Sequence, residues 1–128
     1  MPAYEAVGFT PPAPVALVTL RNRDTGAVLE DVPMLLDSGA DATLIPQEAI
    51  TRLALESISE MNFRMTGFDG SAQFAQAVYL ELLFLGRTFR GDYLPIDQEW
   101  GVLGRNILNF VPLFFDGPRL TWGEYRRV

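Results

Sequence analysis

The fold of this 128-residue chain is decided by the stretch Val32-Pro33-Met34-Leu35-Leu36-Asp37-Ser38-Gly39-Ala40-Asp41-Ala42-Thr43-Leu44-Ile45-Pro46. Its apolar run 34–36 predicts a buried strand, because it is too short for a helix. Asp37 follows directly, although an acid is disfavoured in a strand and costly to bury without a partner. Gly39 then breaks the strand, because it permits a tight turn, and apolar residues resume over 42–45. Packing alone does not explain an acid between two apolar strands.

Taken alone, Asp37-Ser38-Gly39 is an ordinary turn tripeptide, because Asp and Ser side chains hydrogen-bond the local backbone. A second segment, some sixty residues later, changes this interpretation: Gly101-Val102-Leu103-Gly104-Arg105-Asn106-Ile107-Leu108. In it, two apolar residues precede a glycine and a polar pair that opens a short helix. Through the resemblance that the two segments carry together, catalysis becomes the better explanation of the acid.

Together, the two segments resemble the retropepsins, the retroviral-type aspartic proteases. In that family a strand ending in Asp-Thr/Ser-Gly-Ala is followed, in the second half, by apolar-apolar-Gly-Arg-Asn/Asp. The resemblance covers roughly residues 15–122, and Ile45-Pro46-Gln47-Glu48 is more similar to the bacterial and cellular members than to the viral ones. It implies a mainly β, single-domain retropepsin-like acid protease fold, a closed barrel-like sheet with a hairpin flap and one or two short helices.

The resemblance also implies the site. Asp37, Ser38 and Gly39 are the catalytic loop, in which Ser38 orients the loops through the opposite subunit. The substrate-binding positions are Ala40, Asp41, Ala42, Leu44, Gly67, Phe68, Trp100 and Val102. The supporting positions are Leu36, Gly104, Arg105 and Asn106. Asp41 and Arg105 match positions that pair within the family, and Trp100 matches a substrate-pocket wall, although a core tryptophan explains it equally well.

The chain contains one such catalytic loop. Asp69-Gly70 and Asp116-Gly117 lack the hydroxyl residue and the preceding apolar strand, which excludes a two-lobed single-chain enzyme. The second Asp37 must therefore come from a symmetric homodimer. In the implied mechanism the two carboxylates share a proton and activate water, with no metal or other cofactor. The apolar cleft residues imply a peptide or protein substrate with apolar side chains near the cut.

Composition limits the alternatives. Forty-eight per cent apolar residues suffice for one core, and the domain is expected over residues 15–128. The chain has no Cys and no His, and all its basic residues are Arg, which excludes Ser-His triads, thiolate nucleophiles and lysine chemistry. A net charge of −6 argues against nucleic acid as a partner. There is no long apolar run and no basic leader, so neither a membrane span nor secretion is expected, and the location expected is cytoplasmic.

The remaining elements follow from local patterns. Residues 1–14 carry four prolines and predict an extended arm, either a tail or a segment lying across a neighbouring subunit. Strands are predicted over 15–20 and 27–36, with a turn at 24–26 and an edge or bulge at Pro33. A helix is predicted over 47–55, with Pro46 at its first position. Its buried face is expected to contain Ile50, Leu53 and Ala54.

Three hairpins are expected in the second half. The first joins 61–66 to 72–79 through Gly67-Phe68-Asp69-Gly70-Ser71, and it is either the flap or an ordinary surface hairpin. The next joins 78–85 to 88–96, with apolar residues on both faces. The last spans 113–122 and is a plausible dimer surface, because its arms are apolar.

Three rival hypotheses remain. A retropepsin-fold module could dimerise or bind peptides without cleaving them, although the intact Asp37 loop argues against this. An actin-like nucleotide-binding fold needs two domains, which this length does not supply. A carboxylate metal site at Asp37 and Asp41 matches no calcium-loop spacing.

Overall fold

The computed structural model describes residues 1–66 and 72–126, and it describes side chains outside residues 57–75. This part of the chain contains nine strands and two short helices. The elements are β1 (Val15–Arg21), β2 (Val28–Leu36), β3 (Leu44–Pro46), α1 (Gln47–Arg52), β4 (Ser57–Thr66), β5 (Ala72–Phe84), β6 (Arg87–Ile96), β7 (Gly101–Leu103), α2 (Arg105–Leu108), β8 (Leu113–Asp116) and β9 (Thr121–Glu124). No helix of these ranges is long and apolar enough to cross a membrane.

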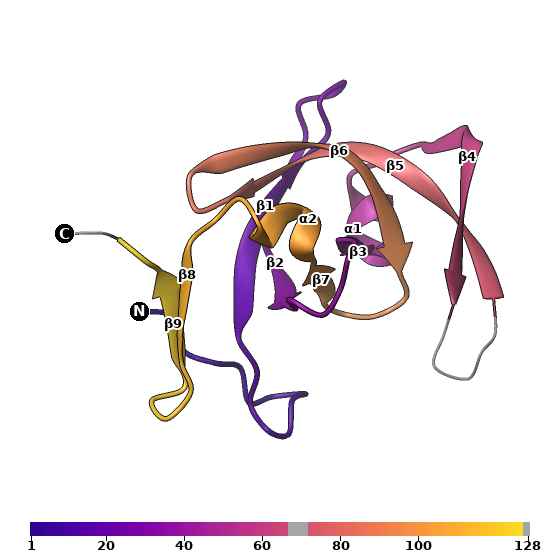
Figure 1. Cartoon of the computed structure of the whole chain (residues 1–128). Helices are drawn as coiled ribbons and strands as arrows, with labels where there is room; N and C mark the ends of the chain where they lie inside the picture. Colours follow the sequence, from indigo (N-terminus) through magenta and orange to yellow (C-terminus); the bar gives the residue numbers. More distant parts are fainter. Residues whose placement is uncertain (67–71, 127–128) are drawn as a thin grey trace.

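Six of the strands close into a barrel (Figure 1). The sheet order is β1-β2-β7-β3-β6-β5-β4, and β1 also pairs with β5, which closes the ring and leaves β4 outside it. The β8–β9 hairpin forms a separate two-stranded sheet on the opposite side of the barrel from β4. The predicted mainly β fold with a closed sheet and two short helices is therefore confirmed.

The β5–β6 hairpin forms as its sequence predicts. Leu85 and Gly86 adopt φ values of 50° and 75°, which match the twist of the flanking strands in a two-residue hairpin turn. One face of β5 is apolar and buried. On the other face Tyr79 is exposed, and the buried residue is the charged Glu81. The carboxylate of Glu81 forms ion pairs with Arg21 and Arg90, whose side chains reach it from β1 and β6. The predicted burial of both faces is therefore wrong at Tyr79, and Glu81 is buried as an ion-paired carboxylate rather than as part of an apolar face.

Helix α1 is shorter than predicted. It ends at Arg52 rather than Leu55, because Ala54 adopts φ 50°, a conformation that no α-helix continues through. The Asn22 side-chain amide donates to the Leu53 carbonyl at 2.8 Å, which satisfies an acceptor at the helix end. Ala54 is exposed, and Ala49 takes its expected place in the core beside Ile50 and Leu53.

The irregularity predicted at Pro33 lies slightly earlier in β2. The register with β1 shifts between Val18 and Leu20, opposite Asp31, which adopts φ 58°. Pairing of β2 with β7 begins only at Met34. Pro33 thus precedes the first residue of β2 that pairs with β7. Its missing N–H therefore removes no hydrogen bond from the β2–β7 ladder.

The predicted N-terminal arm packs against its own chain. Glu5 and Ala13 exchange two backbone hydrogen bonds of 2.8 and 3.0 Å. Nearer the N-terminus, Tyr4 N–H donates to the Leu120 carbonyl at 2.7 Å, and Trp122 N–H donates to the Pro2 carbonyl at 3.0 Å. The arm therefore lies along β9, as Figure 1 shows beside the N-terminus. Trp122 is only 3% exposed, so it belongs to the core and not to the dimer surface proposed from the sequence.

Candidate active site

Asp37 lies where β2 ends. Strand β7 lies between β2 and β3, parallel to β2 with Leu36 opposite Leu103, and antiparallel to β3 with Leu44 opposite Val102. The chain that joins β2 to β3 must therefore loop around the end of β7. Asp37 N–H donates to the Leu103 carbonyl at 3.0 Å, which joins the start of this loop to the end of β7.

One carboxylate oxygen of Asp37 is held by the loop itself. Gly39 N–H donates to Asp37 Oδ1 at 2.9 Å, and Ala40 N–H donates to the Asp37 carbonyl at 3.2 Å. The side chain is half-buried, and within the described residues no group hydrogen-bonds Oδ2. The sequence predicts a tight turn at Gly39. Its φ lies outside the left-handed region, so the reason for glycine is space: a Cβ there would lie 3.1 Å from Asp37 Oδ1, against the carboxylate.

Gly104 brings the second motif into contact with this loop. A Cβ at Gly104 would lie 2.3 Å from the Ala42 carbonyl oxygen, so only glycine allows the two backbones to approach this closely. The next residue, Arg105, donates its backbone N–H to the Ala40 carbonyl at 2.8 Å. Its guanidinium Nη1 donates to the Ser38 carbonyl, also at 2.8 Å. The Asp37 loop is thus held at two of its carbonyls by one residue of α2.

The ion pair expected between Asp41 and Arg105 does not form in this chain. Asp41 and Arg105 are both exposed, and no ion pair joins them in the described part of the structure. The physical reason is that the guanidinium is directed at the Ser38 carbonyl instead, to which it donates a hydrogen bond. Arg105 therefore supports the loop through a backbone acceptor.

Thr43 is a supporting residue that the sequence interpretation missed. Its side chain is 2% exposed, its hydroxyl donates to Asn106 Oδ1 at 2.6 Å, and it accepts the Gly104 N–H at 3.1 Å. These contacts join Asn106, one of the expected supporting residues, to the chain just before β3. The signal was present in the sequence, since a hydroxyl inside an apolar stretch needs partners when it is buried.

The predicted substrate-binding residues differ in exposure. Ala40, Ala42 and Leu44 are half-buried and Asp41 is exposed, whereas Val102 is buried in the sheet opposite Leu44. Trp100 is half-buried and packs against Phe9, with ring centroids 4.9 Å apart. Gly67 and Phe68 lie outside the described residues, between the paired strands β4 and β5.

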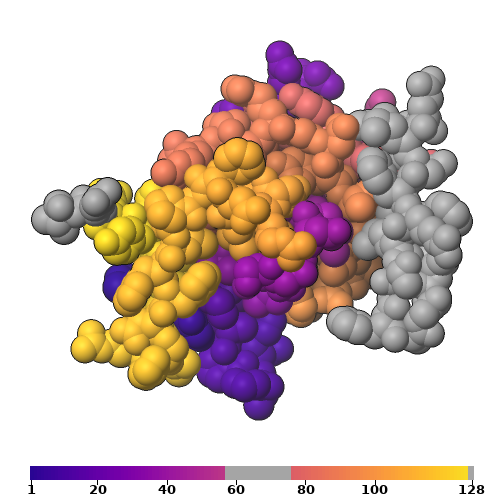
Figure 2. Space-filling model, viewed as in Figure 1, coloured from indigo at the N-terminus to yellow at the C-terminus, as the bar shows by residue number. Residues whose placement is uncertain are grey.

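The Asp37 loop faces solvent. In Figure 2 the violet to magenta atoms of the chain near residue 40 lie at the surface, between the orange atoms of the second half and the indigo N-terminal segment. This placement agrees with the hydrogen bond from Leu36 N–H to the Pro14 carbonyl, 3.0 Å, which joins the N-terminal segment to the end of β2. In a single chain the tip of the loop is therefore open to solvent, with Ser38 and Gly39 exposed and Asp37 half-buried.

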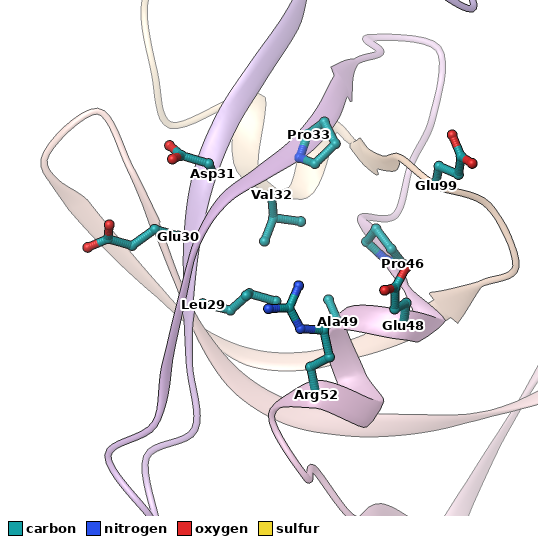
Figure 3. Close-up of a pocket in the computed structure, with 10 residues that line it drawn as sticks. All are labelled: Leu29, Glu30, Asp31, Val32, Pro33, Pro46, Glu48, Ala49, Arg52 and Glu99. Carbon is teal, nitrogen blue, oxygen red and sulfur yellow. The ribbon is translucent and has the colours of Figure 1, made fainter.

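A separate cavity of about 110 Å³ lies between β2 and α1 (Figure 3). It is lined by Leu29, Glu30, Asp31, Val32, Pro33, Pro46, Glu48, Ala49, Arg52 and Glu99. None of the predicted site residues is among them. This cavity is thus not an extension of the Asp37 loop.

No protein-family model and no curated protein sequence matches this chain. Two solved structures are similar to it in fold. EIAV protease in complex with the inhibitor HBY-793 superposes with a TM-score of 0.57 and 21% identity, over 77% of this chain and 86% of that one. A retropepsin-like aspartic protease from Rickettsia conorii superposes with a TM-score of 0.50 and 17% identity, over 81% of this chain and 87% of that one. With its closed barrel and its Asp-Ser-Gly loop around the end of β7, this chain therefore has the fold of the retropepsin-like aspartic proteases.

Proposed function

We propose that this protein is an aspartic endopeptidase, with an active site formed by Asp37 from each of two chains in a symmetric homodimer. The observation that carries the proposal is the state of the Asp37 carboxylate. Its Oδ1 is held by Gly39 N–H, while its Oδ2 receives no hydrogen bond from the described residues. The Asp37 carboxylate is thus held in place through Oδ1, and Oδ2 remains available. It can therefore activate water together with the Asp37 carboxylate of a second chain.

The chemistry follows from bringing two such carboxylates together. Two like charges a few ångströms apart cannot both persist cheaply, so the pair holds one proton between them. The ionised carboxylate takes a proton from the attacking water, and the neutral one donates its proton to the oxygen of the scissile carbonyl. The tetrahedral intermediate then collapses: its C–N bond breaks, the leaving amine takes a proton from the neutral carboxyl, and the ionised carboxylate takes a proton from a hydroxyl of the intermediate, so that the pair again holds one proton.

The surroundings of Asp37 suit a peptide substrate. Ala40, Ala42 and Leu44 place small and apolar side chains along the loop, which favours apolar substrate side chains next to the cut. The hairpin of β4 and β5 is antiparallel and extends from the barrel, and we assign it the role of the flap over bound peptide. Ser38, which is exposed, would hydrogen-bond across the dimer axis.

The test replaces Asp37 by Asn, which keeps the shape of the side chain but cannot act as a base. We expect Asp37→Asn to retain the melting temperature and oligomeric state of the natural chain and to lose peptide hydrolysis by at least about a thousandfold, the scale on which loss of a catalytic group acts. The matched control is Asp92→Asn, because Asp92 is an exposed residue of β6 outside the proposed site, and this variant should cleave peptides as the natural chain does.

Two results would overturn the proposal. The first is residual turnover of Asp37→Asn close to that of the natural chain. The second is saturable peptide binding by the natural chain without any cleavage between pH 3 and 8, roughly the range that spans ordinary and raised carboxyl pKa values. That second result would indicate a peptide-binding module on the same fold.

A further inference from the structure

A groove of about 440 Å³ lies at the end of β1 where that strand has lost its partner on one side. Strand β1 begins at Val15, but it pairs with β5 only over residues 19–21. The groove opens beside the unpaired part, and the first residues of the N-terminal arm and Trp122 of β9 also line it. None of the residues predicted for the catalytic site is among the residues that line this groove.

The backbone of β1 directs hydrogen-bonding groups into the groove. Leu36 N–H donates to the Pro14 carbonyl, so residues 14 and 36 form a hydrogen-bonded pair of the β1–β2 ladder. Such pairs alternate along an antiparallel ladder, so the N–H and C=O groups of Val15 and Leu17 face away from β2. Within residues 1–66 and 72–126 no strand pairs with this edge of Val15 and Leu17, and no backbone group hydrogen-bonds it.

The rest of the lining is mostly apolar, and it includes a donor without a partner. Leu17, which is 65% exposed, lines the groove together with Phe84 and Leu85. Trp122 is 3% exposed, and its indole N–H donates to no acceptor in the described part of the chain. A buried tryptophan ordinarily has such an acceptor. The groove therefore suits a ligand that carries both apolar side chains and carbonyl oxygens.

Charge limits that ligand further. Glu5 is the charged residue among those that line the groove, and the whole chain has a net charge of −6. An acidic ligand would be repelled, whereas a ligand with a basic flank would be attracted.

We infer that this groove binds an extended peptide segment of a partner protein, apolar with basic flanks, which adds to β1 as a further strand. An extended peptide directs N–H and C=O groups to one side at every second residue, the same repeat as Val15 and Leu17. Natural proteins usually cover or charge the free edge of a sheet, but this edge is apolar and uncovered by the described residues. The inference does not depend on the proposed peptide cleavage.

The first experiment tests strand addition with a fluorescein-labelled heptapeptide, Arg-Thr-Val-Thr-Val-Thr-Arg, and the Asp37→Asn protein, in which cleavage cannot interfere. Fluorescence anisotropy should show saturable binding. Two further peptides are N-methylated, one at both valines and the other at the first two threonines, which removes N–H groups from opposite edges of the strand. Because an added strand pairs through one edge, one methylated peptide should bind at least about tenfold more weakly and the other as before.

The second experiment locates the peptide on β1. Leu17→Pro removes the N–H that faces the groove, at an edge position where proline is tolerated, so it should keep the melting temperature and weaken binding about tenfold. The matched control is Leu17→Thr, which keeps the N–H and should bind nearly as the natural residue does. In an NMR titration the indole N–H signal of Trp122 should move, and that of Trp100, which lies outside the groove, should not.

Three results would overturn the inference and leave the protease proposal standing. The first is the absence of saturable binding by the unmethylated peptide. The second is an equal effect of the two methylated peptides, which would indicate apolar contact without strand pairing and needs no change in the protein. The third is dissociation of a dimer by Leu17→Pro without any peptide binding, since a second copy of the chain would then occupy this edge.

Discussion

At the scale of single residues, buried polar groups hold the site in place. The Thr43 hydroxyl makes two contacts at once, with the Asn106 side chain and the Gly104 backbone. Both partners belong to the second motif, so a single hydroxyl connects the loop after Asp37 to the start of α2. A group that is buried and fully hydrogen-bonded contributes mainly through what its loss would leave unsatisfied.

Thr43→Val should therefore destabilise the fold and weaken catalysis. Valine has nearly the same shape, but it leaves the buried Gly104 N–H without an acceptor, which costs about 1–3 kcal/mol of unfolding free energy. Urea unfolding measures the loss, and hydrolysis rates measured well below the unfolding midpoint show its effect on catalysis. The control is Thr51→Val, because Thr51 is exposed and bonds only its own helix. Equal stability of the two variants would contradict this role for Thr43.

Glu81 makes the stability of the barrel dependent on pH. Hydrogen bonds from Arg21, and then from Arg90, lower the pKa of this carboxyl below its ordinary value of 4.5. Because the folded pKa is lower than the unfolded one, the charged carboxylate stabilises the fold above pH 4.5, and this contribution is lost as the pH falls through the folded value.

Glu81→Gln should therefore reduce the unfolding free energy at pH 7 and flatten its decline in acid. Urea unfolding at a series of pH values measures both effects. Glu56→Gln, an exposed carboxylate, is the control and should leave the slope unchanged. A Glu81→Gln protein with the same pH dependence as the natural chain would show that the arginines contribute nothing in solution.

At the scale of elements, the site depends on how closely α2 approaches the loop between β2 and β3. The approach is possible because residue 104 has no side chain, and Arg105 then bonds the Ser38 and Ala40 carbonyls. The Arg105 side chain is exposed, so its hydrogen bond should contribute about 1 kcal/mol or less to stability. A buried ion pair with Asp41, as the family resemblance suggested, would have made its loss several times more costly.

Gly104→Ala should be severely destabilising. The Cβ of the new alanine would lie 2.3 Å from the Ala42 carbonyl oxygen and 2.6 Å from the Ala42 carbonyl carbon. These are backbone atoms, which cannot move aside as a flexible side chain can. We expect a loss of about 3 kcal/mol, at the upper end for overpacking. Gly91→Ala on β6 meets nothing within 4 Å and is the matched control, with an expected change near zero. Similar melting temperatures for both variants would mean that α2 can move away from the loop.

At the scale of the whole molecule, the proposed chemistry requires two chains. The C-terminal hairpin offers a surface for the second one, since Phe114 and Phe115 are each 45% exposed and Leu120 is 43% exposed. Truncation after residue 112 cannot test this surface, because it would also remove Trp122 from the core. Single substitutions on β8 leave the core intact.

Phe115→Ser should weaken the dimer without unfolding the chain. Removing apolar area worth roughly 25 cal/mol per Å² from both sides of a two-fold interface should raise the dimer dissociation constant at least about tenfold. Sedimentation measures that constant, and specific activity should fall at higher protein concentration than for the natural chain, because mass action favours the monomer. Phe110→Ser, 70% exposed but outside the hairpin, is the control. A fully active monomer would refute the dimeric site.

The sequence by itself determined the features that depend on local pattern and on the order of motifs. The apolar run before Asp37 and the turn residues at Gly86 were sufficient for the strand and the hairpin to which they belong. These elements depend on side-chain periodicity or on backbone freedom within a few residues, which can be read directly from neighbouring letters. The closed sheet and the role expected of Asp37 followed instead from the resemblance carried by the order of the two motifs.

Only the tertiary structure decided which distant groups meet. Thr43 and Asn106 are 63 residues apart, and their contact exists because β7 lies between β2 and β3 in one particular register. The same register directs Arg105 to the Ser38 carbonyl rather than to Asp41. Likewise, pairing of the N-terminal arm with β9 accompanies the burial of Trp122, and the hairpin of residues 5–13 places Phe9 on Trp100. Such contacts depend on distances between strands, which the pattern within any one strand does not contain.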